Sequence, residues 1–367
     1  MSSEIKSYLG YEFTPQLLPG AKPSGAPVDV LQTRCHIVEM LSFALSVRAE
    51  RFLFANTFTT SRGARTEVVV VVSELSDGSH CGRGECVPHP RFGETIESVT
   101  GSIMRMRDAM ARGLDRVGLQ SAMPPGAARN ALDCAFWDLE AKRSGMPIHV
   151  VAGLPEPSAV VTAYTISLGT PDEMATAAKA AAWRPLLKIK LGGHGDPERL
   201  RAVRLAAPKT ELIVDANEAW DDSNLAENLA ACAATGVIQV EQPLPAAQDV
   251  ALATTPRAVV VCADESVSDS ASLVCLRGKY DAVNIKLDKA GGLTEALKLA
   301  TSAEREGFRL MVGCRVGTSL AMAPAILLAQ RAQVTDLDGP LLLAADRPNG
   351  LRYDGSFVHP ADPTLWG

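Results

Sequence analysis

The first third of the chain changes its pattern of hydrophobic and polar positions more than once. Residues 1–41 include PQLLPGAKPSGAPVDV, which is rich in Pro, Gly and Ala and lacks sustained periodicity. We interpret this stretch as a flexible extension or linker. Residues 43–74 alternate and end in EVVVVVSEL. Ser76-Asp77-Gly78 then predicts a turn, with a returning strand at 80–85.

Helical patterns follow these predicted strands. One pattern covers roughly residues 94–112, and another covers AARNALDCAFWDLEAKRSG, which ends at Gly145 with Pro147 beyond it. Strands followed by helices are typical of a sheet that is covered by helices on one face. We therefore expect an α+β domain over residues 42–155.

From about residue 158, short β-branched runs alternate with helical segments. The helical segments begin near N-cap residues such as Thr170 and Ser223 and end at Gly or Pro. This repetition predicts a parallel sheet, and eight runs predict closure into a TIM-like (β/α)7β barrel over residues 156–340. The Pro/Gly-rich segment 341–367 is expected to fold back over the first domain. The eight runs are AVVTAYTIS, LLKIKL, ELIVDAN, VIQVEQP, AVVVCADES, AVNIKLD, RLMVGCR and VTDLDG.

The composition argues against some kinds of partner for this chain, namely nucleic acids and membranes. The formal net charge is -6 and there is no dense Lys/Arg stripe, which argues against a nucleic-acid partner. The apolar runs are far shorter than the roughly 20 residues that cross a bilayer. The eight cysteines are scattered without a CxxC pair, and no secretory h-region is present, so we expect reduced thiols in a cytoplasmic protein. A homo-oligomer is compatible with these features.

Charged residues stand at the ends of successive predicted strands. A single charge at such a position is usually a solvated loop residue. Here, five successive predicted strands end in a charged residue. These residues are spaced at intervals of roughly 25 positions, and each interval is about the length of one βα unit. Asp215, Glu241 and Asp264 therefore converge on one mouth of the barrel. Three carboxylates that close would not all ionise without a cation, and an all-oxygen set favours Mg²⁺ over zinc.

Two lysines flank the predicted carboxylates. Lys190 and Lys286 end the second and sixth strands and face one another across the barrel. A proton next to a carboxylate is very weakly acidic, so its removal requires a metal and a base with a lowered pKa. A cation and a neighbouring lysine both lower the pKa of a lysine, and Lys188 could contact a substrate carboxylate oxygen. Two bases on opposite faces of one carbon suit a reaction that inverts that carbon.

Over roughly residues 42–345 the chain resembles the enolase superfamily, which is already known for a lysine or histidine base that works with Mg²⁺. The paired lysines resemble the muconate-lactonizing subgroup, because relatives of mandelate racemase would place a histidine near the seventh strand, and RLMVGCRVG has none. The resemblance implies one Mg²⁺ per subunit, and a capping domain that the N-terminal part and the C-terminal tail form over the barrel. The motifs that carry it are KIK at 188–190, DAN at 215–217, EQP at 241–243, DES at 264–266 and NIKLDKAGG at 284–292.

Within this subgroup the chain is most similar to the L-Ala-D/L-Glu (dipeptide) epimerases, which act on a dipeptide from cell-wall peptide. DLDGP at 336–340 resembles their eighth-strand motif, which implies that Asp336 and Asp338 bind the α-ammonium of the dipeptide. A cationic amino terminus needs such carboxylates. In SRGARTE, the arginine for the glutamate side chain corresponds to Arg65, with Arg62 as a second, weaker candidate.

Two features depart from this family. Residues 1–41 have no counterpart, and Met40 lies close to where members begin, so the extension is expected to be dispensable or to reflect an upstream start. Arg315 stands on the seventh strand where members have an apolar residue. It is a candidate specificity residue that would change the preferred first residue of the dipeptide. Equally, it could pair with an acidic loop residue.

The sequence therefore favours Mg²⁺-dependent epimerisation of a dipeptide, L-Ala-D/L-Glu or similar, at the α-carbon of its C-terminal residue. The two lysines would carry out a 1,1-proton transfer through an enediolate, in murein peptide metabolism. The alternatives are a lactonizing enzyme, a relative similar to o-succinylbenzoate synthase, or a barrel that binds amino-acid derivatives without turnover. Fold alone does not separate them, because barrels host many chemistries.

Overall fold

The N-terminal part of the described chain is a three-stranded antiparallel sheet packed on helices. A computed structural model describes residues 43–367, so the predicted extension at 1–41 lies outside the described residues. Strands β1 (Ala44–Thr60), β2 (Gly63–Ser76) and β3 (Cys81–Cys86) are ordered β1-β2-β3. The predicted turn is present, since Asp77 Oδ1 accepts hydrogen bonds from the backbone of Ser79 and His80 at 2.9 and 2.8 Å.

The helices of this part cover one face of the sheet. The longest, α4, begins at Ala127, where its first amide donates to Glu94, and ends at Gly145 in the left-handed conformation. The predicted helix at 94–112 is two helices, because the chain breaks helical regularity at Arg105 and Met106. The helical segments are η1 (Pro90–Phe92), α1 (Ile96–Met104), α2 (Arg107–Ala111), α3 (Arg116–Ala122), α4 (Ala127–Ser144) and α5 (Ile148–Val151).

Glycines let β3 approach α4 closely. A Cβ at Gly84 would overlap the carbonyl oxygen of Ala131 and lie 2.8 Å from the amide nitrogen of Ala135. Both are atoms of the helix backbone, which cannot move aside as a side-chain end can.

We expect Gly84→Ala to destabilise the protein by about 3 kcal/mol, because the helix and the strand must separate to admit the methyl group. Urea unfolding followed by circular dichroism measures this change. Gly101→Ala is the matched control, since the nearest atom to a Cβ there is a side-chain nitrogen at 3.7 Å, and it should stabilise α1 by about 0.5 to 1 kcal/mol. Equal effects of the two substitutions would contradict this account of the β3–α4 contact.

The second part is a parallel sheet of eight strands in the order β12-β11-β10-β9-β8-β7-β6-β5. The ring closes where the amide of Ala163 donates to the carbonyl of Thr335 at 2.8 Å. The first predicted barrel strand, AVVTAYTIS, is divided in the structure. Val160–Val161 (β4) pairs with β14 outside the barrel, and only Tyr164–Ile166 joins the barrel sheet. The barrel strands are β5 (Tyr164–Ile166), β6 (Leu186–Lys190), β7 (Glu211–Asp215), β8 (Val237–Glu241), β9 (Val260–Ala263), β10 (Ala282–Ile285), β11 (Arg309–Gly313) and β12 (Val334–Asp336).

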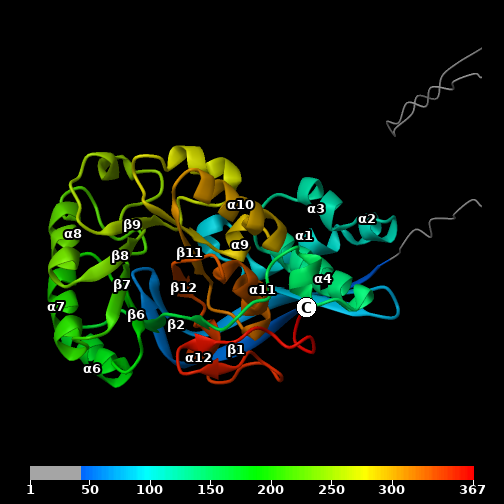
Figure 1. Cartoon of the computed structure of the whole chain (residues 1–367), viewed down its shortest axis with the longest axis horizontal. Coiled ribbons are helices and arrows are strands. Elements are labelled where there is room, and N and C mark those ends of the chain that lie inside the picture. Colours follow the sequence, from blue (N-terminus) through cyan, green and yellow to red (C-terminus); the bar gives the residue numbers. More distant parts are fainter. Residues whose placement is uncertain (1–42) are drawn as a thin grey trace, which may run out of the picture. The chain divides into compact units, whose positions relative to one another are not determined.

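Helices surround the barrel, as Figure 1 shows for α6, α7 and α8 beside β6 to β8. Only short 3-10 helices, Val250–Ala253 and Ser270–Cys275, stand in the connections that follow β8 and β9. These connections still allow the parallel pairing that the βα repetition predicts. The α-helices of this part are α6 (Pro171–Ala181), α7 (Asp196–Ala206), α8 (Leu225–Ala234), α9 (Leu287–Ala290), α10 (Leu293–Arg305), α11 (Ser319–Ala329) and α12 (Gly339–Leu342).

The interior of the barrel is apolar at one end and charged at the other. Successive residues of a strand point to opposite faces, so positions two apart point inward together. Residues such as Leu186 and Ile213 form a small apolar cluster inside the barrel, and further along the same strands Lys188, Lys190 and Asp215 also point inward. Charged side chains therefore line the barrel interior at the end at which the strands finish.

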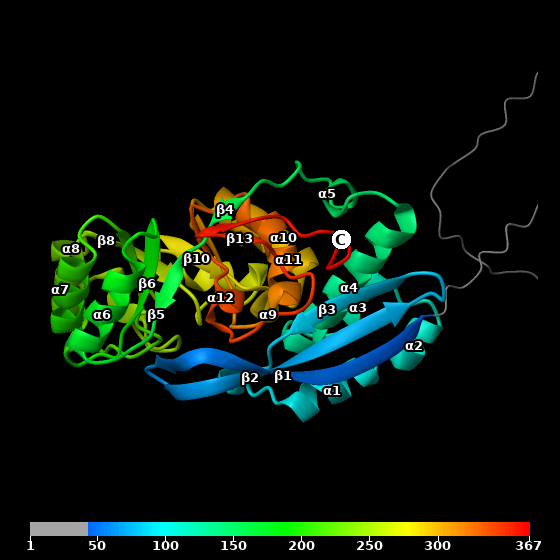
Figure 2. The same cartoon turned by 90° about the horizontal axis from the view of Figure 1, so that it is seen from below.

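The C-terminal tail returns to the first part of the chain. Strands β13 (Tyr353–Asp354) and β14 (Phe357–Val358) pair with each other, and Trp366 Nε1 donates to the carbonyl of Cys134 in α4 at 3.0 Å. Figure 2 shows β1 and β2 running from the α4 side toward β5 and β6 of the barrel. The expected fold, a barrel with an α+β cap, is confirmed.

Candidate active site

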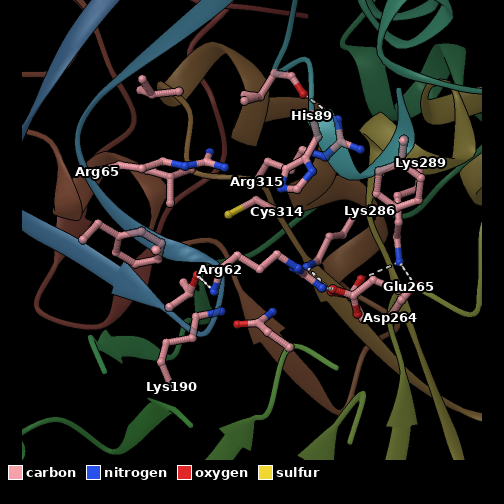
Figure 3. Close-up of a pocket in the computed structure, with 18 of the residues that line it drawn as sticks. Arg62, Arg65, His89, Lys190, Asp264, Glu265, Lys286, Lys289, Cys314 and Arg315 are labelled. Atoms are coloured by element: carbon pink, nitrogen blue, oxygen red, sulfur yellow. Dashed lines mark hydrogen bonds and ion pairs between the residues drawn. The ribbon is translucent and has the colours of Figure 1, made fainter. Parts of the chain in front are cut away.

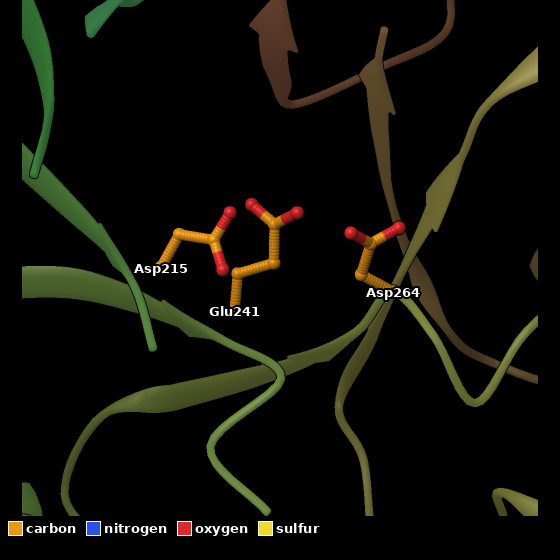
Figure 4. A group of neighbouring side chains, drawn as sticks. All are labelled: Asp215, Glu241 and Asp264. Carbon is orange, nitrogen blue, oxygen red and sulfur yellow. The ribbon is translucent and has the colours of Figure 1, made fainter. Parts of the chain in front are cut away.

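Three buried carboxylates meet at the charged end of the barrel. Asp215 ends β7, Glu241 ends β8 and Asp264 follows β9. One oxygen from each lies within 4.8 Å of the others (Figure 4). The β7–β8 register places Asp215 beside Glu241, so adjacent parallel strands by themselves bring the first two together. An all-oxygen set at this spacing fits a hard divalent cation such as Mg²⁺.

The electrostatics of these carboxylates also fit a cation. Burial and the charge of Asp215 raise the pKa of Glu241 to about 7. Burial opposes ionisation of Asp215 as well, but the ammonium groups of Lys190 and Lys188 outweigh it and lower its pKa. A bound cation would favour the charged form of all three groups.

The backbone just beyond these carboxylates is in an uncommon conformation. Asn217 and Glu218, after β7, have φ values of 47° and 65°, and Gln242, after β8, has a φ of 35°. The amide of Asn217 donates to Asp215 Oδ1 at 2.9 Å and fixes that carboxylate. Left-handed backbone at residues other than glycine costs energy and tends to occur at functional sites.

Lys188 is enclosed by carboxylates. Its Nζ lies 2.6 Å from Glu241, 2.7 Å from Asp336 and 3.2 Å from Asp215. Burial alone would lower the pKa of Lys188, but the charges of Asp336 and Glu241 raise it well above its usual value. The charged form of Lys188 is therefore favoured, and its ammonium group links the three carboxylates on the inner wall.

The two predicted bases lie on opposite walls of the barrel. Lys190 Nζ is 2.6 Å from Asp215, and Lys286 Nζ is 2.7 Å from Asp264 and 3.5 Å from Glu241. The charges of Asp264 and Glu241 outweigh burial and raise the pKa of Lys286, opposite to the direction predicted from the sequence. The same carboxylates are the ones that a cation would neutralise, so a lowered pKa is expected of the metal-bound protein.

Lys289 is a part of this cluster that the sequence reasoning missed. Its Nζ lies 2.5 Å from Asp264 Oδ1 and donates to the carbonyl of Asn284 at 3.1 Å. Burial lowers the pKa of Lys289 despite the charge of Asp264. Its place in the motif NIKLDKAGG, three residues after Lys286 in the short helix α9, could have identified it.

A cavity of about 120 Å³ lies between the cap and this end of the barrel. The predicted residues Arg65, Lys190, Asp264, Lys286 and Arg315 all line it. Figure 3 shows Arg65 and Arg315 in one part of the pocket and Lys190 and Asp264 in another. The pocket therefore combines side chains of both parts of the chain.

Arg62 ties the cap to the barrel across this pocket. Its Nη2 lies 2.9 Å from Glu218 and also contacts Glu265, and these acids follow β7 and β9. Arg91 of the cap is 2.8 Å from Glu218 as well. Arg62 is thus committed to ion pairs, whereas Arg65 makes no ion pair with the residues that the structure describes.

Asp336 and Asp338 lie together on the inner wall but are not among the residues that line the cavity. Asp336 Oδ2 contacts Lys188, while Oδ1 is buried and has no hydrogen-bond partner among the described residues. Asp338 Oδ2 accepts from the amide of Thr165 at 2.7 Å. Burial and the charge of Asp336 raise the pKa of Asp338 to about 7. Among the described residues, the ammonium group that contacts this pair is that of Lys188, through Asp336.

Arg315 follows β11. Its two interpretations, as a specificity residue and as the partner of an acidic loop residue, are compatible. It pairs with Glu94 of a cap loop at 2.9 Å, as the alternative to a specificity role supposes. It also lines the cavity.

Family models match most of the chain. Residues 44–153 match the model of the mandelate racemase / muconate lactonizing enzyme N-terminal domain, and residues 172–363 match the model described as enolase C-terminal domain-like. The chain belongs to the enolase superfamily. The resemblance read from KIK, DAN, EQP and DES is thereby confirmed.

Known members of this superfamily are similar to the chain over nearly their whole length. The L-Ala-D/L-Glu epimerase of Escherichia coli is 46% identical over 82% of this chain and 95% of its own. The N-acetyl-D-glutamate racemase of a Pseudoalteromonas species is 42% identical over 81% and 95%. Both names denote isomerases, which agrees with the predicted enzyme class.

Solved enolase-superfamily structures are also similar. One from Agrobacterium tumefaciens, described as homologous to dipeptide epimerases and bound to sodium and L-Ala-L-Glu, has a TM-score of 0.87 and 56% identity and covers 89% of this chain and 100% of its own. A dipeptide epimerase from Enterococcus faecalis, complexed with Mg and L-Leu-L-Tyr, has a TM-score of 0.80 and 28% identity. The match covers 87% of this chain and 96% of that structure's chain.

In the described part of the chain, no helix is long and apolar enough to cross a membrane.

Proposed function

We propose that the chain is a Mg²⁺-dependent dipeptide epimerase that inverts the α-carbon of the C-terminal residue, with L-Ala-D/L-Glu or a similar dipeptide as substrate. The observation that carries this proposal is the position of Lys190 and Lys286 on either side of the carboxylates Asp215, Glu241 and Asp264. The names of the superfamily members similar to this chain support the reaction type. The proposed setting is murein peptide metabolism.

The barrel geometry suits a transfer by two bases. Lys190 ends β6 and Lys286 follows β10, and these strands are four apart in a ring of eight, so the lysines approach the axis from opposite sides. One lysine would remove the α-proton and the other would deliver a proton to the opposite face. The metal, held by the three carboxylates, supplies positive charge against the negative charge that develops on the substrate carboxylate.

The remaining predicted residues would orient the dipeptide. Asp336 and Asp338 would hold the α-ammonium, since Asp336 Oδ1 accepts no hydrogen bond from the residues that the structure describes. Arg65 would hold the side-chain carboxylate, because it reaches the pocket without an ion pair among the described residues. Lys188 would contact a substrate carboxylate oxygen, as expected from the sequence, and would also keep Asp215, Glu241 and Asp336 in place.

A second candidate is racemisation of an N-acylated amino acid such as N-acetylglutamate, which the 42% identical racemase favours. The two substrates differ at the nitrogen, which is a cation in a dipeptide and a neutral amide in an N-acylated amino acid. The pair Asp336 and Asp338 favours the cation, since two buried carboxylates need positive charge.

Proton exchange in D₂O tests the proposal. NMR spectra of L-Ala-L-Glu and L-Ala-D-Glu with the protein and Mg²⁺ should show loss of the glutamate α-proton signal and formation of the other diastereomer. N-acetylglutamate should exchange far more slowly. Exchange of N-acetylglutamate alone would favour the second candidate, and exchange of none of these compounds would contradict both.

A further inference from the structure

Arg315 has a hydrogen-bond donor that the protein leaves unused. Its side chain is 7% exposed. The Nη1 group donates to the carbonyl of Val87 and to Glu94, whereas Nη2 is buried and has no partner among residues 43–367. A buried guanidinium donor without an acceptor costs free energy. Arg315 lines the pocket, so an acceptor on a ligand bound there would supply the partner that Nη2 lacks.

His89 offers a second donor in the same pocket. Its Nδ1 accepts from the amide of Arg91 at 3.2 Å. Burial, together with the charges of Arg315 and Arg65, lowers the pKa of His89 to about 3, so the ring is neutral near pH 7. A neutral imidazole that accepts at Nδ1 carries its proton on Nε2. No hydrogen bond in the described part of the chain uses this Nε2 group.

Glu94 holds both donors in place. Its Oε2 accepts from the backbone of His89 at 3.0 Å and from Arg315 Nη1 at 2.9 Å, and its Oε1 accepts from Ala127 at the start of α4 at 2.8 Å. The ring of Phe92 lies 5.0 Å from the Arg315 guanidinium and 6.0 Å from the His89 ring. The two donors therefore belong to one ordered structure of the cap loop.

We propose that Arg315 and His89 are specificity-determining residues that donate to the side-chain carboxylate of the substrate's C-terminal residue, beside Arg65. This inference rests on the proposed function and adds two residues to it. Figure 3 shows Arg65, His89 and Arg315 in the same part of the pocket. Because Glu94 is already engaged by its own donors, this part presents donors to a ligand.

An environment of donors distinguishes a carboxylate from an amide of the same size. A carboxylate accepts at both oxygens, whereas the NH₂ group of a glutamine side chain would face donors and lose its own hydrogen bonds. The subsite should therefore select glutamate over glutamine through hydrogen bonding as well as through the charge of Arg65.

A matched pair of peptides, L-Ala-L-Glu and L-Ala-L-Gln, tests this selection. In Arg315→Lys the ammonium can still pair with Glu94, but the Nη2 donor is lost. The ratio of kcat/KM for the glutamate over the glutamine peptide should fall roughly tenfold or more, mainly through KM, with Tm unchanged. His89→Phe should lower the same ratio, and His89→Gln, which keeps a donor near the position of Nε2, should largely restore it.

Calorimetric titration of both peptides in Mg²⁺ measures the same selectivity as a binding affinity rather than as a rate. An affinity ratio that stays unchanged in Arg315→Lys and His89→Phe would overturn this inference. So would an equal loss for both peptides with a lower Tm, since that pattern means that the two residues only hold the cap loop. Failure of the unaltered protein to exchange any dipeptide would contradict the proposed function instead, and the affinity ratio would still decide the subsite.

Discussion

Lys286→Ala is expected to lose interconversion of L-Ala-L-Glu and L-Ala-D-Glu by about 10³-fold or more, while one of the two diastereomers continues to exchange its α-proton in D₂O. Lys190→Ala should give the opposite result, with exchange surviving only for the other diastereomer. The reason is geometric, since β6 and β10 place the two ammonium groups on opposite sides of the barrel axis. Each lysine can reach the α-proton of one configuration only.

NMR of both peptides with each variant measures the two exchange rates separately. Lys298→Ala is the matched control, because this lysine is on the surface of α10 with a side chain 67% exposed, and it should leave both rates unchanged. Full activity in both directions for Lys286→Ala would refute the two-base mechanism. Loss of both exchanges in both variants, at an unchanged Tm, would show that neither lysine works alone as the base.

Removal of the metal is the second change with a large expected effect. Treatment with EDTA should abolish exchange, and Mg²⁺ should restore it, because the charge that develops on the substrate carboxylate then has no cation beside it. Stability should change much less than activity. Four lysine side chains, three of them buried and one half-buried, already lie against the carboxylates of the site, so folding should not depend on the ion alone. These lysines are Lys188, Lys190, Lys286 and Lys289.

Activity and Tm measured on the same samples separate these two effects. The Tm should rise with Mg²⁺ concentration, since a ligand that binds only the folded state stabilises it by about 2.7 kcal/mol at 100 times its Kd. Asp215→Asn should lose most of the activity even in excess Mg²⁺. Glu211→Gln, at the exposed opposite end of the same strand β7, should behave as the unaltered protein. Activity that survives EDTA would exclude a metal-dependent reaction.

The cap and the barrel supply residues with different proposed roles in the site. The carboxylates and lysines that would perform the chemistry all come from barrel strands or the segments just after them. The groups that would bind the substrate side chain come mainly from the cap, which supplies Arg65 and His89. The barrel supplies Arg315. Substrate selectivity can therefore change in the cap while the barrel keeps its reaction.

The sequence alone determined the barrel and the residues at its mouth. Strand and helix patterns repeat with a period of one βα unit, and the ends of parallel strands must meet at one edge. Charges at the ends of five successive strands therefore implied that Asp215, Glu241 and Asp264 lie together, and they do. The same reasoning placed Lys190 and Lys286 at the pocket, because their positions depend only on strand order.

Only the tertiary structure decided what each charged group contacts. Lys188 and Lys190 stand two residues apart in the KIK pattern and share a face of their strand, yet Lys188 is enclosed by carboxylates whereas Lys190 lines the pocket. Lys289 reaches Asp264 because α9 begins directly after β10 and turns that side chain back into the barrel. His89 and Arg315 are brought together by Glu94 across more than 200 positions of sequence. Local patterns carry no information on such contacts, since side-chain pairing depends on packing between distant segments.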